Sequence, residues 1–336
     1  MNVPAWLWVV TLAITLAVLV FDVFVIARRP REPSRAEVSI ALSVYIGLAI
    51  LFGIGVWVFA GHQYGTEFFA GWLTEYSLSI DNLFIFIIIM SRLAVPRELQ
   101  QSALMVGIVL ALVFRAIFIA IGATAIEQFS WVFYIFGAFL VYTAVKLALQ
   151  GPEDEDEYEE GPVVRWLRGK LPMTEGWHGS KAWVRVNGKR LFTPMLLVIV
   201  GLGTTDLLFA LDSIPAIFGL TQEAYLVLTA NIFALMGLRQ LYFLIGGLLE
   251  RLIFLTYGLA VLLGFIGIKL VLHAMHTNEL PFVNGGHPIH GAPEISIVWS
   301  LTAIVVILAV TVVASLVVGR RQTPERRDEE TGPRGH

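Results

Sequence analysis

The sequence contains no cysteine, and only 15% of its 336 residues are charged. The lack of cysteine excludes disulfide bonds, iron–sulfur clusters and thiolate metal sites, which argues against a pump for soft metals. An ordinary globular protein has about 25% charged residues. The low charge, together with 57% hydrophobic residues, excludes a plain soluble domain. The formal net charge of −3 gives no argument for nucleic-acid binding.

Long apolar segments dominate the chain. Nine of them are read at 5–27, 38–60, 67–91, 101–123, 130–149, 194–218, 222–246, 252–272 and 295–318. Each has about the 20 residues needed to cross a bilayer. Because a single segment in lipid must satisfy its own backbone hydrogen bonds, each segment is expected to be a helix. The predicted fold class is therefore all-α, a polytopic membrane protein of about nine transmembrane helices.

Basic residues alternate from one connection to the next. The connections after the first, third, fifth, seventh and ninth segments contain Lys or Arg, and the other connections contain none. The positive-inside rule then places the N-terminus outside and the C-terminus in the cytoplasm of a multi-pass plasma-membrane protein. Four basic residues lie within spans or at their edges: Arg115, Lys146, Arg239 and Lys269.

An acidic spacing occurs twice. The third and sixth spans each contain an acid, five intervening residues, a second acid, and then an amide or hydroxyl residue. These residues are Glu75, Asp81 and Asn82 in the third span and Asp206, Asp212 and Ser213 in the sixth. The basic connections indicate that these two spans cross the membrane in opposite directions, so the repeat is inverted. Inverted repeats are typical of secondary transporters, whose substrate site lies near the midplane where the repeats meet.

The spans that follow these two also match. Steps of eight and seven residues relate Gly107, Arg115 and Gly122 in one span, and Asn231, Arg239 and Gly246 in the other. Two linked matches make chance a poor explanation. The repeat divides the chain into N-terminal helices 1–60, a first half 61–150, a cytoplasmic loop 151–193, a second half with the final helix 194–318, and a disordered cytoplasmic tail 319–336.

The antiparallel course of the two acidic helices predicts two acidic layers. Glu75 and Asp212 are expected in the outer layer, and Asp81 and Asp206 in the inner one. The layers would lie about 9 Å apart, which is the rise of six helical residues. Each carboxylate at the bilayer centre costs about 2.5–3.5 kcal/mol even on a lenient scale, so four of them need a compensating function or counter-ions.

The donors around these acids predict a metal site built from oxygen. Carboxylates, an amide and a hydroxyl favour a hard divalent ion such as Mn²⁺, Mg²⁺ or Ca²⁺. Pro215 is expected to interrupt its helix and to free the carbonyl of Leu211 as a further ligand. The predicted side-chain ligands are Glu75, Asp81, Asn82, Asp206, Asp212 and Ser213.

Charge balance predicts that protons accompany the metal. Four ionised carboxylates around one divalent ion leave an excess of negative charge at low dielectric, so some are expected to be protonated when the metal is absent. Metal loading would then release protons, which is the minimum requirement for metal–proton antiport. Arg115 and Arg239 are interpreted as counter-ions to the acids, and the alternative is that they bind an anionic substrate.

Two regions outside the spans have both a structural and a functional interpretation. The predicted outer loop contains His273, His276, His287 and His290. These are either ordinary interface histidines or an outer metal or pH-sensing site. The acidic run at 152–160 is either a solvated, disordered linker or a loose metal-collecting segment.

The chain resembles the TerC/Alx family of bacterial integral membrane proteins, which is named for tellurium resistance. The resemblance runs from about residue 35 to residue 318 and is carried by the segments "EYSLSIDNLFIF", "TTDLLFALDSIPAIFGLT", "NIFALMGLRQLYFLIGG", "GFIGIKLVLHAMH" and "LPFVNGG". It implies a transporter related to the lysine-exporter superfamily, with export of Mn²⁺ in several members. The family's motif residues fall on the six predicted ligands. Two departures are Tyr76, where the family commonly has lysine, and Gly203, where many members have an acid.

These observations predict a secondary transporter in a bacterial inner membrane that exports a divalent cation, Mn²⁺ in the first place, in exchange for protons. No resident cofactor and no enzymatic activity are expected, because no nucleophile–base pair or phosphate loop is evident. One alternative is a membrane scaffold in a metal or tellurite stress-resistance complex, with cytoplasmic or membrane partners. Another is an exporter of an amino acid or an oxyanion.

Overall fold

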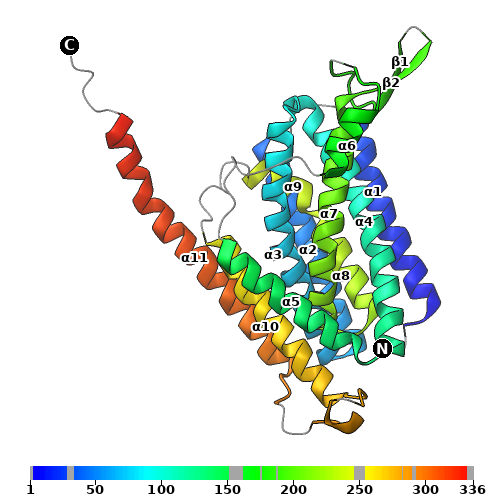
Figure 1. Ribbon diagram of the computed structural model, residues 1–336, viewed down its shortest axis with the longest axis vertical. Helices are drawn as coiled ribbons and strands as arrows, with labels where there is room; N and C mark the ends of the chain where they lie inside the picture. The colour runs from blue at the N-terminus through cyan, green and yellow to red at the C-terminus, as the bar shows by residue number, and fades with distance from the viewer. Residues whose placement is uncertain are drawn as a thin grey trace.

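The computed structural model describes residues 3–28, 34–150, 162–174, 176–186, 188–245, 254–281, 283–289 and 293–330. Within the helices, the side chains at 19, 22–28, 35, 81, 84, 150, 245 and 319–330 are outside this description. The described part of the chain is a bundle of long helices with one small β-hairpin at one end (Figure 1).

The predicted spans are helices in the structure. Before the loop between the repeats the chain forms α1 (Ala5–Arg28), α2 (Arg35–Ala60), α3 (His62–Arg92), α4 (Arg97–Gln128) and α5 (Val132–Gln150). After this loop it forms α7 (Pro194–Phe218), α8 (Ala224–Met236), α9 (Leu238–Ile245), α10 (Leu255–His276) and α11 (Ile297–Glu330). Among the described residues, eight helices are long and apolar enough to cross a membrane, and α1 adds a shorter apolar stretch. The all-α, polytopic membrane class is therefore confirmed.

The packing of the helices follows the repeat in the sequence. The first repeat is α3, α4 and α5, and the second is α7, α8 with α9, and α10. Helix α3 packs on α8, α4 packs on α7, and α5 packs on α10 (Figure 1). Exchanging the two repeats reproduces the same pairs, as a two-fold relation requires. The third helices also match in sequence, since "AVKLAL" around Lys146 corresponds to "GIKLVL" around Lys269.

Helices α5 and α10 approach each other closely where the two repeats meet. A Cβ on Gly137 would lie 2.9 Å from the carbonyl oxygen of Gly267, and a Cβ on Gly267 would lie 3.0 Å from the carbonyl oxygen of Gly137. Neither helix can carry a larger residue at this crossing without moving the other backbone. Small residues at helix crossings are the usual way in which membrane helices pack closely.

The expected helix interruption is found in a different helix. Pro215 lies within α7, which stays continuous through it and ends three residues later, and the amide of Gly219 donates to the carbonyl of Pro215 at 3.0 Å. The break instead separates α8 from α9 at Gly237. A Cβ on Gly237 would lie 3.3 Å from Leu42 and 3.5 Å from Tyr76, so a small residue lets α2 and α3 pack against the break.

The loop between the repeats contains regular secondary structure. Helix α6 (Pro162–Lys170) precedes a hairpin of β1 (Trp183–Val186) and β2 (Lys189–Phe192), paired antiparallel with Trp183 opposite Phe192. The acidic run at 152–160 lies outside the described residues. At the other end of the chain, α11 continues as a helix to Glu330, where a disordered tail had been expected from residue 319.

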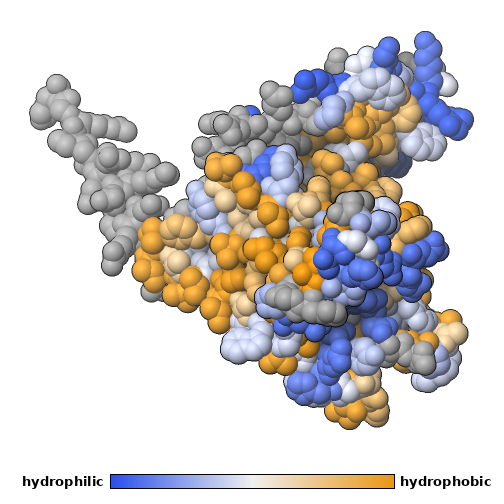
Figure 2. All heavy atoms as spheres, turned by 60° about the horizontal axis from the view of Figure 1, so that its bottom comes forward, coloured by the Kyte–Doolittle hydropathy of each residue, from blue (hydrophilic) through white to orange (hydrophobic). Residues whose placement is uncertain are grey.

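The outer surface matches a chain surrounded by lipid. Large apolar side chains are exposed on α1, α2 and α11, including Phe21, Phe59 and Trp299. Hydrophobic residues occupy the middle of the visible face in Figure 2, and hydrophilic residues gather toward its ends. The polar residues with functional potential are instead buried between the repeats.

Candidate functional site

A buried charged cluster lies where the two repeats meet. Arg115 on α4 forms an ion pair with Glu75 on α3, through Nη1 and Oε1. The same guanidinium donates from Nη2 to Oδ1 of Asp206 on α7 at 3.3 Å, and from Nη1 to Oδ1 of Asn231 on α8 at 2.9 Å. Each of these four side chains is at most 1% exposed. One arginine thus joins four helices and both repeats.

The cluster leaves several buried polar atoms without a partner. Among the described residues, Oε2 of Glu75, Oδ2 of Asp206 and Nε of Arg115 have no hydrogen-bond partner, and neither has the hydroxyl of Ser213 on α7. Buried polar atoms in native proteins are nearly always satisfied, and an unsatisfied one calls for an explanation such as a bound ion or water. The free oxygens next to the ion pairs are therefore the atoms most able to accept a cation or a proton.

A second group of predicted residues faces a different set of helices. Asp212 on α7 accepts a hydrogen bond from the hydroxyl of Thr143 on α5 at 3.2 Å. Asp212 and Asn82 line the same small cavity of about 80 Å³, which α10 closes with Leu259 and Leu263. Lys146 on α5 is within electrostatic reach of Asp212. Asp212 and Thr143 are half-buried, unlike the residues of the Arg115 cluster, whereas Asn82 is buried.

The two groups differ from the two layers that the sequence predicted. Glu75 and Asp206 share one guanidinium, whereas the sequence placed them in different layers. A step of six residues turns an α-helix by about 600°, so two acids with this spacing point about 120° apart. Asp206 and Asp212 therefore face different helices. Among the described residues, no group of three or more His, Asp or Glu side chains is close enough to hold a metal.

The roles of two predicted residues stay predictions. The side chain of Asp81 lies outside the described residues, although its backbone belongs to α3. Arg239 lies on α9, directly after the break at Gly237, and its role as a counter-ion is still an expectation from the sequence.

The histidines of the predicted outer loop contact separate partners. His273 shares a hydrogen bond of 2.9 Å with the amide of Gln222 and packs edge-on against Phe133. His276 contacts the carbonyl of Leu272 through Nδ1 at 3.1 Å. His290 lies outside the described residues, and His287 lies beyond the end of α10 in the loop. The outer metal or pH-sensing site therefore stays a prediction.

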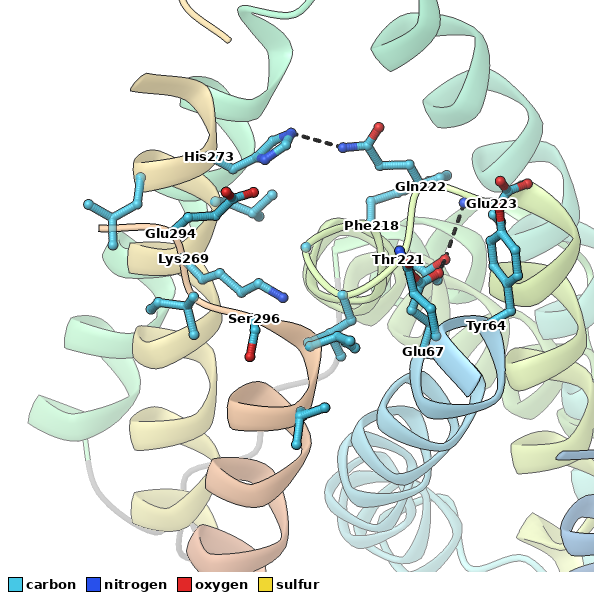
Figure 3. A pocket seen from close by; sticks show the side chains of 18 of the residues that line it. Tyr64, Glu67, Phe218, Thr221, Gln222, Glu223, Lys269, His273, Glu294 and Ser296 are labelled. Atoms are coloured by element: carbon cyan, nitrogen blue, oxygen red, sulfur yellow. Dashed lines mark hydrogen bonds between the residues drawn. The ribbon is translucent and has the colours of Figure 1, made fainter. Parts of the chain in front are cut away.

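A large polar cavity opens at the end of the bundle where α3 begins (Figure 3). Its volume is about 740 Å³, and it lies between the start of α3, the end of α7, the end of α10 and the start of α11. Glu67 is its most buried acid and accepts a hydrogen bond from the hydroxyl of Thr221 at 2.6 Å. Lys269 extends into the cavity within electrostatic reach of Glu67 and Glu294.

Several of these residues were not among the sequence-predicted sites. Asn231 was noted only as part of the repeat, and Glu67 and Thr143 were not singled out. A usable signal existed for Glu67 and Lys269, because an ionisable residue within a membrane-spanning segment is a functional candidate by default. No comparable signal marks Thr143, since threonine is common in apolar helices and its role depends on the facing acid.

Comparisons with known proteins agree with this architecture. Residues 60–323 match the model of the integral membrane protein TerC family. An uncharacterized membrane protein of Mycobacterium tuberculosis is 45% identical over 318 residues, covering 94% of this chain and 80% of the relative. The putative membrane-bound redox modulator Alx of Escherichia coli is 42% identical over 272 residues, covering 78% of this chain and 84% of Alx. No solved structure matches the chain.

Proposed function

Because the chain belongs to the TerC family of integral membrane proteins, we propose that it is a secondary transporter that exports a divalent cation, Mn²⁺ in the first place, in exchange for protons. The observation that carries the proposal is the buried cluster of Glu75, Asp206 and Arg115 between the inverted repeats. Inverted-repeat transporters bind their substrates at this position.

The charge of the cluster favours a cation over an anion. Two carboxylates and one guanidinium leave one negative charge when both acids are ionised, and burial makes an unbalanced charge costly. The guanidinium of Arg115 is already engaged by Glu75, Asp206 and Asn231. An oxyanion would have to displace these carboxylates, whereas a cation or proton finds carboxylate oxygens that lack partners.

The donor chemistry favours a hard cation. The unpartnered atoms of Glu75, Asp206 and Ser213 are all oxygens, and the chain has no cysteine. Carboxylate and hydroxyl oxygens suit Mn²⁺, Mg²⁺ and Ca²⁺. The choice of Mn²⁺ among these ions rests on the family resemblance, in which several members export it.

Arg115 and the metal would compete for the same carboxylates. With Arg115 in place, one proton neutralises the cluster. A divalent ion neutralises Glu75 and Asp206 together only when the guanidinium withdraws. Metal and proton would therefore occupy the cluster in alternation, which is the coupling that antiport requires. In this mechanism the guanidinium of Arg115 occupies the two carboxylates whenever no metal ion is bound to them.

A route from the cluster to one surface follows α3. Glu67 in the polar cavity precedes Glu75 by eight residues, which is about 12 Å along a helix. Gly71 lies between them, and a Cβ there would contact Ile217 and Ala230 at 3.4 and 3.6 Å. Movement of α7 or α8 at Gly71 would connect the cavity with the cluster.

Transport in proteoliposomes tests the proposal. Vesicles with the full chain would be loaded with Mn²⁺ and an internal pH dye, and efflux would be followed with proton flow. We expect the wild type to exchange Mn²⁺ for protons, and Glu75→Gln, Asp206→Asn and Asp212→Asn to reduce the rate at least tenfold, the size expected for loss of a charge-assisted contact. The exposed Glu98 at the start of α4 supplies the matched control, Glu98→Gln.

Other results would favour the alternative functions. If wild type and variants all behave like empty vesicles, transport of Mn²⁺ is rejected. A scaffold then predicts that the acid variants keep their stress resistance in cells, while deletion of 152–160 abolishes it. An exporter of amino acids or oxyanions predicts flux of those solutes that depends on Arg115 or Arg239 more than on the acids.

The description of the Escherichia coli relative Alx as a putative membrane-bound redox modulator fits a metal exporter in one respect. This chain has no cysteine, so thiol–disulfide chemistry cannot carry a redox role here. Export of a redox-active metal ion would change the redox state of the cell without any redox group in the protein. The transport experiment above also tests this link.

A further inference from the structure

Helix α6 lies near the ends of two of the helices that are long enough to span a membrane. Its buried side chain, Val164, packs against α7 close to Ile89 of α3: a Cβ on Gly201 would lie 3.6 Å from both Val164 and Ile89. Ile89 is three residues from the end of α3, and Gly201 is seven residues after Pro194 at the start of α7. At 1.5 Å per residue, these positions are about 5 to 11 Å from the helix ends. Helix α6 is therefore held near these helix ends, where the interfacial layer of a bilayer is expected.

The rest of α6 has the composition of an interfacial helix. Trp166 and Val163 are 61% and 43% exposed, although both are apolar. Arg165, Arg168 and Lys170 are the only charged residues of the helix. Exposed aromatic and aliphatic side chains next to basic ones are typical of helices that lie in the headgroup region of a membrane.

The hairpin next to α6 concentrates positive charge. Arg185 on β1 is directly opposite Arg190 on β2, and like charges at this position destabilise a strand pair. The guanidinium of Arg190 also lies over the ring of Trp183, 4.9 Å from its centroid. A bound anion between the two arginines would remove the repulsion.

A basic pocket lies on the same hairpin. His178, Lys181, Trp183 and Arg185 line a cavity of about 630 Å³, together with small and aliphatic residues, and no acid is among its described lining residues. From Pro162 to Phe192 the sequence has seven Lys or Arg residues and one acid, Glu175. The region from Pro162 to Phe192 thus carries a net positive charge.

We propose that α6 and the hairpin form a binding surface for anionic phospholipids. The lipid phosphate is received by Lys181, Arg185 and Arg190, while Trp166 and Val163 lie among the neighbouring headgroups and acyl chains. Free phosphate would contact the same cations, but it would make no favourable contact with the exposed apolar side chains of α6. The proposal is independent of transport and of the direction in which the chain crosses the membrane.

Lipid titration of the full chain tests the proposal. The protein would be purified in a neutral detergent and titrated with phosphatidylglycerol or phosphatidylcholine, with bound lipids counted by native mass spectrometry. We expect the wild type to prefer phosphatidylglycerol, and the triple variant Lys181→Gln, Arg185→Gln, Arg190→Gln to lose at least about tenfold in this preference. The matched control removes three charges from the tail, as Arg326→Gln, Arg327→Gln, Arg334→Gln, and should keep the preference.

A second variant protects the test against misfolding. Arg185→Gln alone relieves the repulsion across the hairpin, so this variant should be at least as thermally stable as the wild type and still bind phosphatidylglycerol more weakly. Equal loss in the tail control, or no preference in the wild type, would overturn the proposal. Displacement of the lipid by millimolar inorganic phosphate would assign the site to free phosphate.

Discussion

Arg115 and Asp206 are separated by 91 positions in the chain and meet in the centre of the bundle, where Nη2 of the arginine donates to Oδ1 of the aspartate at 3.3 Å. Each residue belongs to a different repeat, so the contact links the two halves. The same arginine also pairs with Glu75 of its own repeat. Stability and cargo binding are therefore expected to depend on the same side chain.

Arg115→Gln should lower stability strongly at neutral pH. The change leaves Glu75 and Asp206 buried without a countercharge, and removal of one partner of a buried ion pair typically costs about 3–5 kcal/mol. The loss should shrink as the pH falls, because protonation removes the unbalanced charge. Thermal unfolding of the detergent-solubilised protein, followed by tryptophan fluorescence at pH 5 and pH 8, measures both effects.

The partner changes decide whether charge is the cause. Arg115→Gln combined with Glu75→Gln should recover part of the stability at pH 8, because less unpaired charge remains. Arg115→Lys keeps the charge but loses the forked geometry that contacts two acids and an amide, so it should lie between the wild type and Arg115→Gln. A loss that is the same at both pH values would attribute the effect to packing alone.

Gly137→Ala should destabilise the α5–α10 pair. The new Cβ would lie 2.9 Å from the carbonyl oxygen of Gly267 and 3.0 Å from the backbone nitrogen of Val271, and backbone atoms cannot rotate away. Overpacking of this kind costs about 1–3 kcal/mol. Gly55→Ala on α2 is the control, because a Cβ there meets nothing within 4 Å. Equal melting temperatures for the two variants would contradict the close approach.

Thr221→Val should weaken the connection that closes one side of the polar cavity. Thr221 donates to Oε2 of the buried Glu67 at 2.6 Å, and the valine leaves this oxygen without its donor, at a cost of about 1–3 kcal/mol. Thr124→Val is the comparison, because the hydroxyl of Thr124 bonds only to the carbonyl of Ala120 in its own helix. Thermal unfolding of both variants should show a clear loss for Thr221→Val alone.

Lys269→Gln should make the polar cavity more attractive to cations. Lys269 is the ammonium near Glu67 and Glu294, and its removal leaves the cavity more negative. We expect the KM for Mn²⁺ applied from the cavity side to fall by a factor of about two to ten, with a steeper dependence on salt. Arg321→Gln in the tail removes the same charge elsewhere and should leave the KM unchanged. An unchanged KM in Lys269→Gln would show that the cavity does not lie on the path.

The helices could be predicted from the sequence because membrane-spanning segments are read directly from hydropathy. The predicted span 194–218 coincides with α7, and the spans 5–27 and 38–60 end within a residue of α1 and α2. The repeat was also visible, since its spacing survives in the sequence. The break at Gly237 was not, because one glycine in an apolar run gives no sign of which neighbours pack against it.

The arrangement of the charged residues was harder to predict. The sequence located the acids and Arg115, but not that Glu75 and Asp206 share one guanidinium. The two acidic layers were predicted from the position of each acid along its helix, without the direction in which its side chain points around the helix axis. In addition, the long side chain of Arg115 can contact acids that lie at different depths. Helix α6 and the hairpin were missed because a short, strongly basic segment has the composition of a linker unless its buried residue, Val164, is known.

The glycine contact between α5 and α10 has a mechanical consequence. Two helices whose backbones touch at Gly137 and Gly267 have little freedom to slide or separate, so they are expected to move as one rigid unit. Asp212 and Thr143 lie at the interface between this unit and α7. A small tilt of the α5–α10 pair would widen or close the interface with α7 along its whole length. The hydrogen bond between Thr143 and Asp212 would then hold this interface closed.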